Sequence, residues 1–288
     1  MKTFTKRNLL LFFRDKSTVF FSLLAVLIII ALYVVFLGDV WLSDSMKGIE
    51  NINTLMNSWL VAGLLAVASV TTTMGAFGVM IDDKARKINK DFYSSPIKKS
   101  SITGGYIGSA CLIGVVMSII TALVSQIYIV LSGGEWFSLM VYMKIFCLTL
   151  FTSITNTSLV CFIVSFFKSH NAFSAANTII GTLIGFLTGI YLPIGSLPEA
   201  VQTAIKIFPV SQAASLFRKV LMEDGMSKVF DGIPVEHLDG FKEYMGVTFS
   251  FGSNEVSTFS SILILAGTAV VFYCLSLLNM SRKRQSYQ

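Results

Sequence analysis

Six long apolar stretches with almost no charged residues dominate the sequence and limit what the chain can fold into. Each is close to the roughly 20 residues that a helix needs to cross the hydrocarbon core of a bilayer. Inside lipid a segment must satisfy its own backbone hydrogen bonds, and the alternating pattern of barrel strands is absent from the sequence. We therefore expect an all-α, polytopic membrane protein. Its single transmembrane domain, residues 1–288, has six predicted transmembrane helices at 17–37, 59–80, 106–131, 141–167, 172–192 and 261–280.

Most basic residues lie before the first stretch, between the second and third stretches, and after the sixth. The segments richest in Lys and Arg are expected on the cytoplasmic side of a membrane. With six crossings, the N-terminal run 2–16, the connection 84–99 and the tail 282–284 all fall on that side, whereas the net acidic connection 39–57 falls on the other. Both termini are therefore predicted to be cytoplasmic.

The net charge of +6 does not indicate nucleic-acid binding, because the basic residues cluster beside membrane stretches, where orientation and anionic membrane lipids explain them. The cysteines lack paired or metal-type spacing and are expected to be reduced. His170 and His237 are predicted on opposite sides of the membrane. No catalytic set of side chains and no metal site is predicted, so the chain does not look like an enzyme.

The connection between the second and third stretches, residues 81–103, joins a charged, helix-forming run to a proline turn. Pro96 is expected to force Ser95 into an extended conformation. Such a segment can lie along the membrane and present a rigid knob to a cytoplasmic partner. The alternative is a solvated loop that only follows the positive-inside rule.

The longest segment outside the stretches, residues 193–260, is predicted to be extracellular. Its first part, 198–222, has apolar residues at helical spacing and is broken at Pro209, so each half is too short to cross a membrane. We expect a re-entrant or interfacial helical hairpin before the last transmembrane helix. The remainder is polar and forms a small cap, with turns expected at three Asp-Gly pairs, which end at Gly225, Gly232 and Gly240.

Small residues mark one face of the fifth stretch. Gly181, Gly185 and Gly189 have four-residue spacing, which lets another helix approach closely. Helix packing is the expected role, and a mobile surface along a transport pathway is the alternative. Gly104 and Gly108 form a weaker copy at the start of the third stretch.

Polar side chains inside the stretches are the candidates for a transport pathway: Thr72, Asn156, Asn177 and Thr182. Threonine hydroxyls often bond the carbonyl one turn back, but an asparagine amide in hydrocarbon needs a partner or a wet cavity. Apart from Lys144 near the outer end of the fourth stretch, the stretches lack charged residues. This argues against a proton relay or an ion-coupled carrier.

An ATP-binding motif is absent, because the sequence contains no Gly-Lys pair of the kind that ends a phosphate-binding loop. The chain therefore has no cofactor site of its own. ATP hydrolysis, if it drives this protein, must come from a partner.

Several segments, in their order along the chain, resemble a known family. The basic run Lys6–Lys16 leads directly into the first stretch, and Ser95-Pro96-Ile97 precedes the third. The fifth stretch ends in Tyr191-Leu192-Pro193, and Phe208-Pro209-Val210 and Leu216-Phe217-Arg218 follow in the hairpin. This arrangement resembles the membrane-spanning permease subunit of bacterial ABC transporters of the type-2 exporter (ABC-2) family.

The resemblance implies that residues 1–16 form a cytoplasmic helix on the membrane surface and that residues 81–103 form a coupling loop. The surface-helix candidates are Lys6, Arg7, Arg14 and Asp15. The candidate contacts to an ATP-binding subunit are Lys84, Arg86, Lys87, Asp91, Phe92, Ser95, Pro96, Ile97 and Lys98.

The resemblance also implies the partners. They are two copies of a cytoplasmic subunit that binds Mg-ATP and a second permease chain, either identical or different, in the bacterial cytoplasmic membrane. The complex would export an amphiphilic or hydrophobic substrate, such as a drug, a peptide or a lipid-like molecule. Alternatives are an ATP-independent channel or secondary carrier, and a non-transporting sensor or immunity protein.

Overall fold

The computed structural model describes residues 1–37, 49, 51–252 and 254–285, and most of these residues are helical. The predicted all-α class is confirmed. Most of the acidic connection predicted at 39–57 lies outside the described residues. The elements in chain order are α1 (Lys2–Arg14), α2 (Lys16–Leu32), the π-helical η1 (Tyr33–Leu37), α3 (Ile52–Ala85), α4 (Ile88–Ser94), α5 (Lys99–Leu131), α6 (Leu139–Ser165), α7 (His170–Leu187), the 3₁₀ helix η2 (Ile194–Ser196), α8 (Glu199–Ile207), α9 (Pro209–Leu221), α10 (Glu223–Val229), α11 (Val235–Tyr244), the short strands β1 (Ser250–Phe251) and β2 (Asn254–Glu255), and α12 (Thr258–Gln285).

Five helices among the described residues are long and apolar enough to cross a membrane. They are α2 with the start of η1, α3, α5, α6 and α12. The helix α7, with 18 residues, is not among them, because polar side chains at its beginning dilute its apolar character. The predicted stretches therefore correspond to helices, and the structure supports a multi-pass membrane protein.

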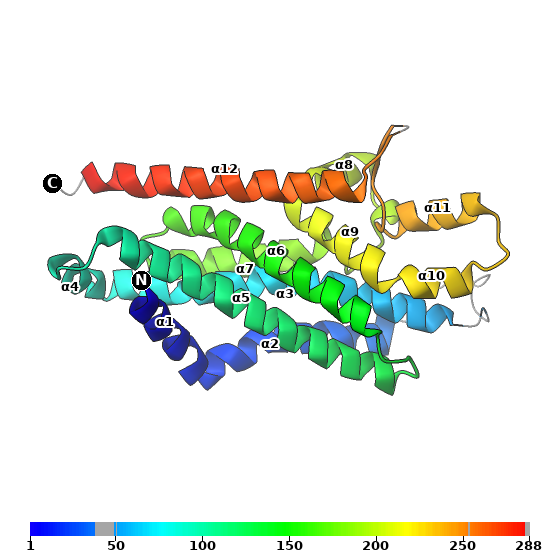
Figure 1. The fold of residues 1–288 in the computed structure, drawn as a ribbon, viewed down its shortest axis with the longest axis horizontal. Helices are drawn as coiled ribbons and strands as arrows, with labels where there is room; N and C mark the ends of the chain where they lie inside the picture. The colour runs from blue at the N-terminus through cyan, green and yellow to red at the C-terminus, as the bar shows by residue number, and fades with distance from the viewer. Residues whose placement is uncertain (38–48, 50, 253, 286–288) are drawn as a thin grey trace.

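The long helices lie side by side and define two ends of the molecule (Figure 1). The N-terminus, α4 and the end of α12 lie at one end, here called the basic end and comprising residues 1–16, 84–99 and 282–285. The opposite end, here called the cap end, contains α10 and α11 and comprises residues 188–257. The three basic segments that the sequence predicted on one side thus lie at the same end of the fold.

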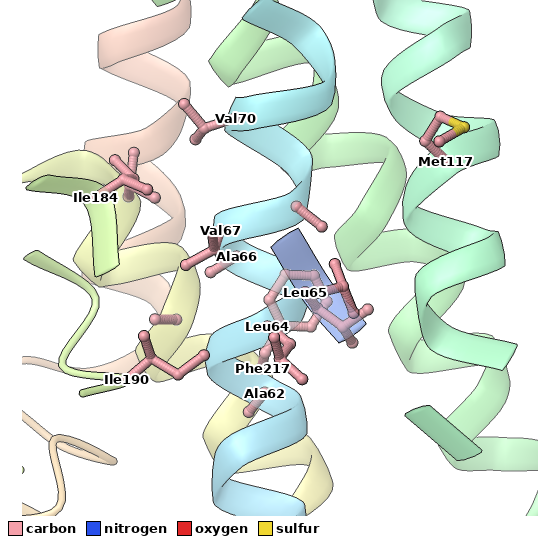
Figure 2. Close-up of a cluster of buried hydrophobic side chains, with 14 of the residues drawn as sticks. Ala62, Leu64, Leu65, Ala66, Val67, Val70, Met117, Ile184, Ile190 and Phe217 are labelled. Atoms are coloured by element: carbon pink, nitrogen blue, oxygen red, sulfur yellow. The ribbon is translucent and has the colours of Figure 1, made fainter. Parts of the chain in front are cut away.

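Helix α3 forms the centre of the bundle and packs against α5, α6, α7 and α9. In its most apolar stretch 78% of the residues are buried, compared with 18% in α2 and 17% in α12. Figure 2 shows the core around α3, where side chains such as Leu64 and Leu65 meet Phe217 of α9 and where Ile184 of α7 lies on another side. The outer helices therefore leave broad apolar faces uncovered.

The observed helices extend beyond the predicted membrane stretches at several ends. The second stretch was predicted at 59–80, but α3 continues through the charged residues to Ala85. Apolar composition marks only the part of a helix that can lie in lipid, so it underestimates the whole helix. The opposite difference occurs in α7, which ends at Leu187 rather than 192, because Gly189 adopts a left-handed conformation with φ of 66°.

The break predicted in the hairpin is present. Helix α8 ends at Ile207, and Pro209 is the first residue of α9, a position where the missing N–H of proline costs no helical hydrogen bond. In the cap, Gly232 has φ of 72° as a turn requires, but the turns expected at Gly225 and Gly240 are wrong. Those two glycines lie inside α10 and α11.

Candidate functional site

Helix α1 crosses the other helices at the basic end (Figure 1), and one of its faces is buried against them. Its buried residues Phe4, Asn8 and Phe12 are spaced four apart and therefore lie on one stripe. The small residues at the start of α5 make room for this stripe, since a Cβ on Gly105 would lie 2.6 Å from the Phe4 ring. Asn8 also donates a hydrogen bond of 3.3 Å to Ser109 of α5. A polar residue thus occupies the middle of the docking stripe.

An ion pair between Arg7 and Asp83 joins α1 to the end of α3. The two guanidinium nitrogens of Arg7 donate to the two carboxylate oxygens of Asp83 at 2.6 and 2.8 Å, and the Tyr106 hydroxyl donates to the same carboxylate at 2.5 Å. Asp83 is buried, with 3% of its surface exposed. The hydrogen bond to Asp83 raises the pKa of Arg7 above its ordinary value, so Arg7 stays charged. We call these three residues the basic joint.

Two aromatic rings cover the guanidinium of the basic joint. The Arg7 carbon Cζ lies 5.5 Å from the centre of the Phe4 ring and 5.0 Å from that of Phe92 in α4. The two rings also contact each other edge to face at 5.1 Å. Aromatic rings close to a guanidinium add cation–π attraction. The joint therefore connects α1, α3, α4 and α5 in one packed unit.

The connection between α3 and α5 has the shape that the sequence predicted. Lys87 adopts a left-handed conformation between α3 and α4, and Ser95 is extended before Pro96 with ψ of 159°, as expected. Of the candidate contacts, Phe92 and Ser95 are half-buried and Lys84 is partly buried. The exposed ones are Arg86, Lys87, Asp91, Pro96, Ile97 and Lys98. These exposed residues, here called the rim, thus surround the half-buried aromatic ring of Phe92.

Asp15 forms the corner between α1 and α2. Its carboxylate accepts hydrogen bonds from the backbone N–H groups of Ser17 and Thr18 and from the Thr18 hydroxyl, at 3.1, 3.2 and 2.7 Å. This is an N-cap, which stabilises the start of α2 and fixes the direction of the chain. The other surface-helix candidates, Lys6 and Arg14, are exposed.

The pathway candidates fall into two groups. Thr72 and Asn156 are buried in the bundle, where the Thr72 hydroxyl donates to the Ala68 carbonyl and the Asn156 amide donates to Ser69 at 2.7 Å. Asn177 and Thr182 instead lie on α7, half-buried and exposed respectively. The Thr182 hydroxyl donates to its own helix, whereas the Asn177 amide has no hydrogen-bond partner among the described residues.

The three glycines of the fifth predicted stretch, two in α7 and one just after it, have different surroundings. A Cβ at Gly181 would meet nothing within 4 Å, whereas one at Gly185 would lie 2.2 Å from the Tyr191 ring. Gly189 ends the helix in a left-handed conformation. The close approach at Gly185 therefore involves the chain that folds back after α7 rather than another long helix.

A buried arginine, Arg218 of α9, lies at the cap end. It is completely buried, and one guanidinium nitrogen donates to the carbonyls of Thr188 and Gly189 at 2.8 and 3.2 Å. The other contacts the Gly246 carbonyl at 3.4 Å, and Cζ lies 5.0 Å from the Trp59 ring. These carbonyls follow the C-terminal ends of α7 and α11, where helix dipoles favour a cation. We call this arrangement the carbonyl cage.

Sequence reasoning missed Asp83 and the burial of Arg218. The sequence places Asp83 only within a charged connection, and Arg218 only within the Leu216-Phe217-Arg218 element of the hairpin. A signal for Arg218 was present, because it lies four residues after Ala214 and three before Leu221, on the apolar stripe of α9. For Asp83 the signal is weaker, since its partner Arg7 is 76 residues away in the sequence.

The fold and the two ends define the class: a multi-pass membrane protein built on a helical bundle, with an exposed, anchored connection at its basic end. A family described as ABC-2 family transporter protein matches residues 41–278. The chain belongs to this ABC-2 family, a family of transporter permeases without an ATPase site of their own. No curated protein matches the chain.

Proposed function

We propose that the chain is the permease subunit of an ATP-driven exporter in the bacterial cytoplasmic membrane, in which a separate subunit hydrolyses Mg-ATP. The basic end is cytoplasmic, α7 makes the sixth crossing, and the hairpin of α8 and α9 re-enters from the opposite side. Family membership supports the transport role. The collection of Lys and Arg at one end supports the orientation.

One observation carries the proposal: the connection between α3 and α5 is exposed at its rim and anchored at its base. The exposed Ile97, with 47% of its surface accessible, and its charged neighbours can contact a protein that approaches from the cytoplasm. Phe92 and the basic joint tie the same segment to α1 and to the central helix α3. A push on the rim by an ATP-binding subunit is therefore transmitted to two crossing helices and the surface helix together.

A second permease chain would complete the polar face of α7. An unpaired amide in hydrocarbon is costly, and Asn177 has no partner among the described residues. The exposed face of α7 also carries Thr182 beside large apolar side chains such as Leu183. A partner subunit or a hydrated pathway satisfies Asn177, whereas lipid does not.

The character of this face favours an amphiphilic or hydrophobic cargo. It presents apolar side chains, one amide and the two hydroxyls of Thr178 and Thr182, and carries no charge between Asn177 and Phe186. Thr72 and Asn156 are enclosed by neighbouring helices, so we assign the pathway to Asn177 and Thr182 rather than to them. Outward transport rests on the family resemblance.

The test is affinity purification of the chain from native membranes in mild detergent, with mass spectrometry and an ATPase assay of the co-purifying material. We expect a stoichiometric Walker-A protein and vanadate-sensitive ATP hydrolysis. Recovery of this chain alone, active in liposomes without ATP, would instead support a channel or a secondary carrier.

A further inference from the structure

A groove runs between α1 and α5 at the basic end. It has a volume of about 400 Å³ and is formed by two exposed lysines and otherwise largely apolar walls. The lining residues are Met1, Lys2, Thr5, Lys6, Leu9, Gly108, Cys111 and Leu112. The one hydroxyl in this set, that of Thr5, is directed to the Gly105 carbonyl at 3.5 Å. The walls therefore offer hydrocarbon contacts, while positive charge is confined to one side.

The two lysines are available for an anion. Neither Lys2 nor Lys6 forms an ion pair within the part of the chain that the structure describes. They are four residues apart on α1 and therefore project from the same face of the helix. The basic joint uses Arg7 and leaves this face of α1 unengaged.

A second groove adjoins the first along α5. It has a volume of about 280 Å³, lies between α5, α6 and α12, and shares Cys111 with the first. Of its three hydroxyl residues, Thr157 and Ser158 donate to carbonyls of their own helix and Tyr273 is the third, while the other lining residues are largely apolar. Leu112, 47% exposed, lies on the outward side of the first groove. Two apolar grooves thus meet beside one pair of lysines.

We propose that these two grooves bind one anionic phospholipid, with its headgroup phosphate between Lys2 and Lys6 and its acyl chains along the apolar walls. Basic pockets beside crossing helices attract anionic headgroups on the cytoplasmic side of a membrane. A soluble phosphate would meet only two solvated lysines, and a neutral lipid would leave their charge uncompensated. Charge and wall chemistry together favour the anionic lipid.

The experiment titrates the purified full-length chain with dioleoylphosphatidylglycerol or dioleoylphosphatidylcholine and measures the first binding event by native mass spectrometry. Each lysine near an anionic surface contributes about fivefold to affinity, so Lys2→Gln with Lys6→Gln should weaken phosphatidylglycerol binding about thirtyfold. Phosphatidylcholine carries no net charge, so its binding should change by less than about twofold.

The matched control is Arg14→Gln with Lys16→Gln, which removes the same charge from the same basic run but lies outside the groove. Equal weakening in the control would show diffuse attraction to the basic end and overturn the site. Equal affinity of the wild-type chain for both lipids would overturn it as well.

A second variant tests the apolar walls. Cys111→Phe fills the wall that the two grooves share and should weaken phosphatidylglycerol binding while both lysines remain. Unchanged binding by a folded Cys111→Phe chain would exclude the grooves as the acyl-chain site. If this variant does not fold, the lysine pair and its control decide the question.

Discussion

Two arginines are packed into the fold, one at each end, and their charges are compensated in different ways. In the basic joint, Arg7 is neutralised by the Asp83 carboxylate and keeps 31% of its side chain accessible. In the carbonyl cage, Arg218 is completely buried and is surrounded by backbone carbonyls and the Trp59 ring, with no carboxylate among the contacts described.

In the basic joint the arginine is held by a side-chain carboxylate, whereas in the carbonyl cage the arginine is held by backbone carbonyls. Arg7 and Asp83 can be replaced together, because each side chain compensates the charge of the other. The cage depends on where α7 and α11 end, so its acceptors cannot be removed by substitution. We infer that the cap end is a rigid support, whereas the basic end is where relative movement of helices is transmitted.

The largest effect is expected from Arg218→Ala. Removal of the guanidinium leaves the carbonyls of Thr188 and Gly246 without a donor in a buried site and opens a cavity beside Trp59. The expected loss of stability is about 4 kcal/mol, measured by thermal unfolding in detergent. Arg218→Lys keeps the charge but lacks the planar guanidinium that donates from two nitrogens, and should therefore recover only part of the lost stability. Wild-type stability of the alanine variant would show that the carbonyl cage does not contribute to the stability of the fold.

The next effect is expected at the basic joint. Asp83→Asn leaves Arg7 without its carboxylate and should cost about 2 kcal/mol, less than at the cage because Arg7 is partly accessible to water. The double variant Arg7→Met with Asp83→Leu should recover much of this loss, since a buried ion pair can be replaced by apolar side chains of similar size. If the loss in the double variant equals the sum of the losses in Arg7→Met and Asp83→Leu measured singly, the two residues act independently.

Much of the fold, but little of these two sites, could be predicted from the sequence. The apolar stretches locate the long helices, and Pro209 locates the break between α8 and α9, because both signals are local. The basic joint needs contact between residues 7, 83 and 106, which only the packing of α1 on α5 creates. The end of α7 was placed five residues late because the conformation of Gly189 is set by the chain that folds back beneath it.

An effect of similar size is expected at Gly185, one turn before the cage. Gly185→Ala places a methyl group against the Tyr191 ring and should cost about 2 kcal/mol through overpacking. The control is Gly181→Ala, which meets nothing within 4 Å and should change stability by less than about 1 kcal/mol, in the stabilising direction. Thermal unfolding of both variants measures the difference. Equal behaviour would argue that the chain after α7 is not held against the helix.

The smallest effect is expected from Tyr106→Phe, which removes one donor to Asp83 and keeps the ring against Phe4. The bidentate pair with Arg7 remains, so the loss of stability should be about 1 kcal/mol. In the Asp83→Asn background the same substitution should cost less than about half of that, because the charged acceptor is already gone. A double-mutant cycle in thermal unfolding checks this coupling, and strictly additive losses would contradict it.

The most direct test of the coupling proposal compares the two ends by cross-linking in native membranes. A photo-reactive residue is placed at Ile97 of the basic end or, as the control, at Ile233 of the cap end, two apolar side chains that are 47% and 38% exposed. Our account predicts that position 97 cross-links to a protein with an ATP-binding motif and that position 233 does not. A cross-link to such a protein from position 233, or none from position 97, would contradict the proposal that the basic end receives the ATP-binding subunit.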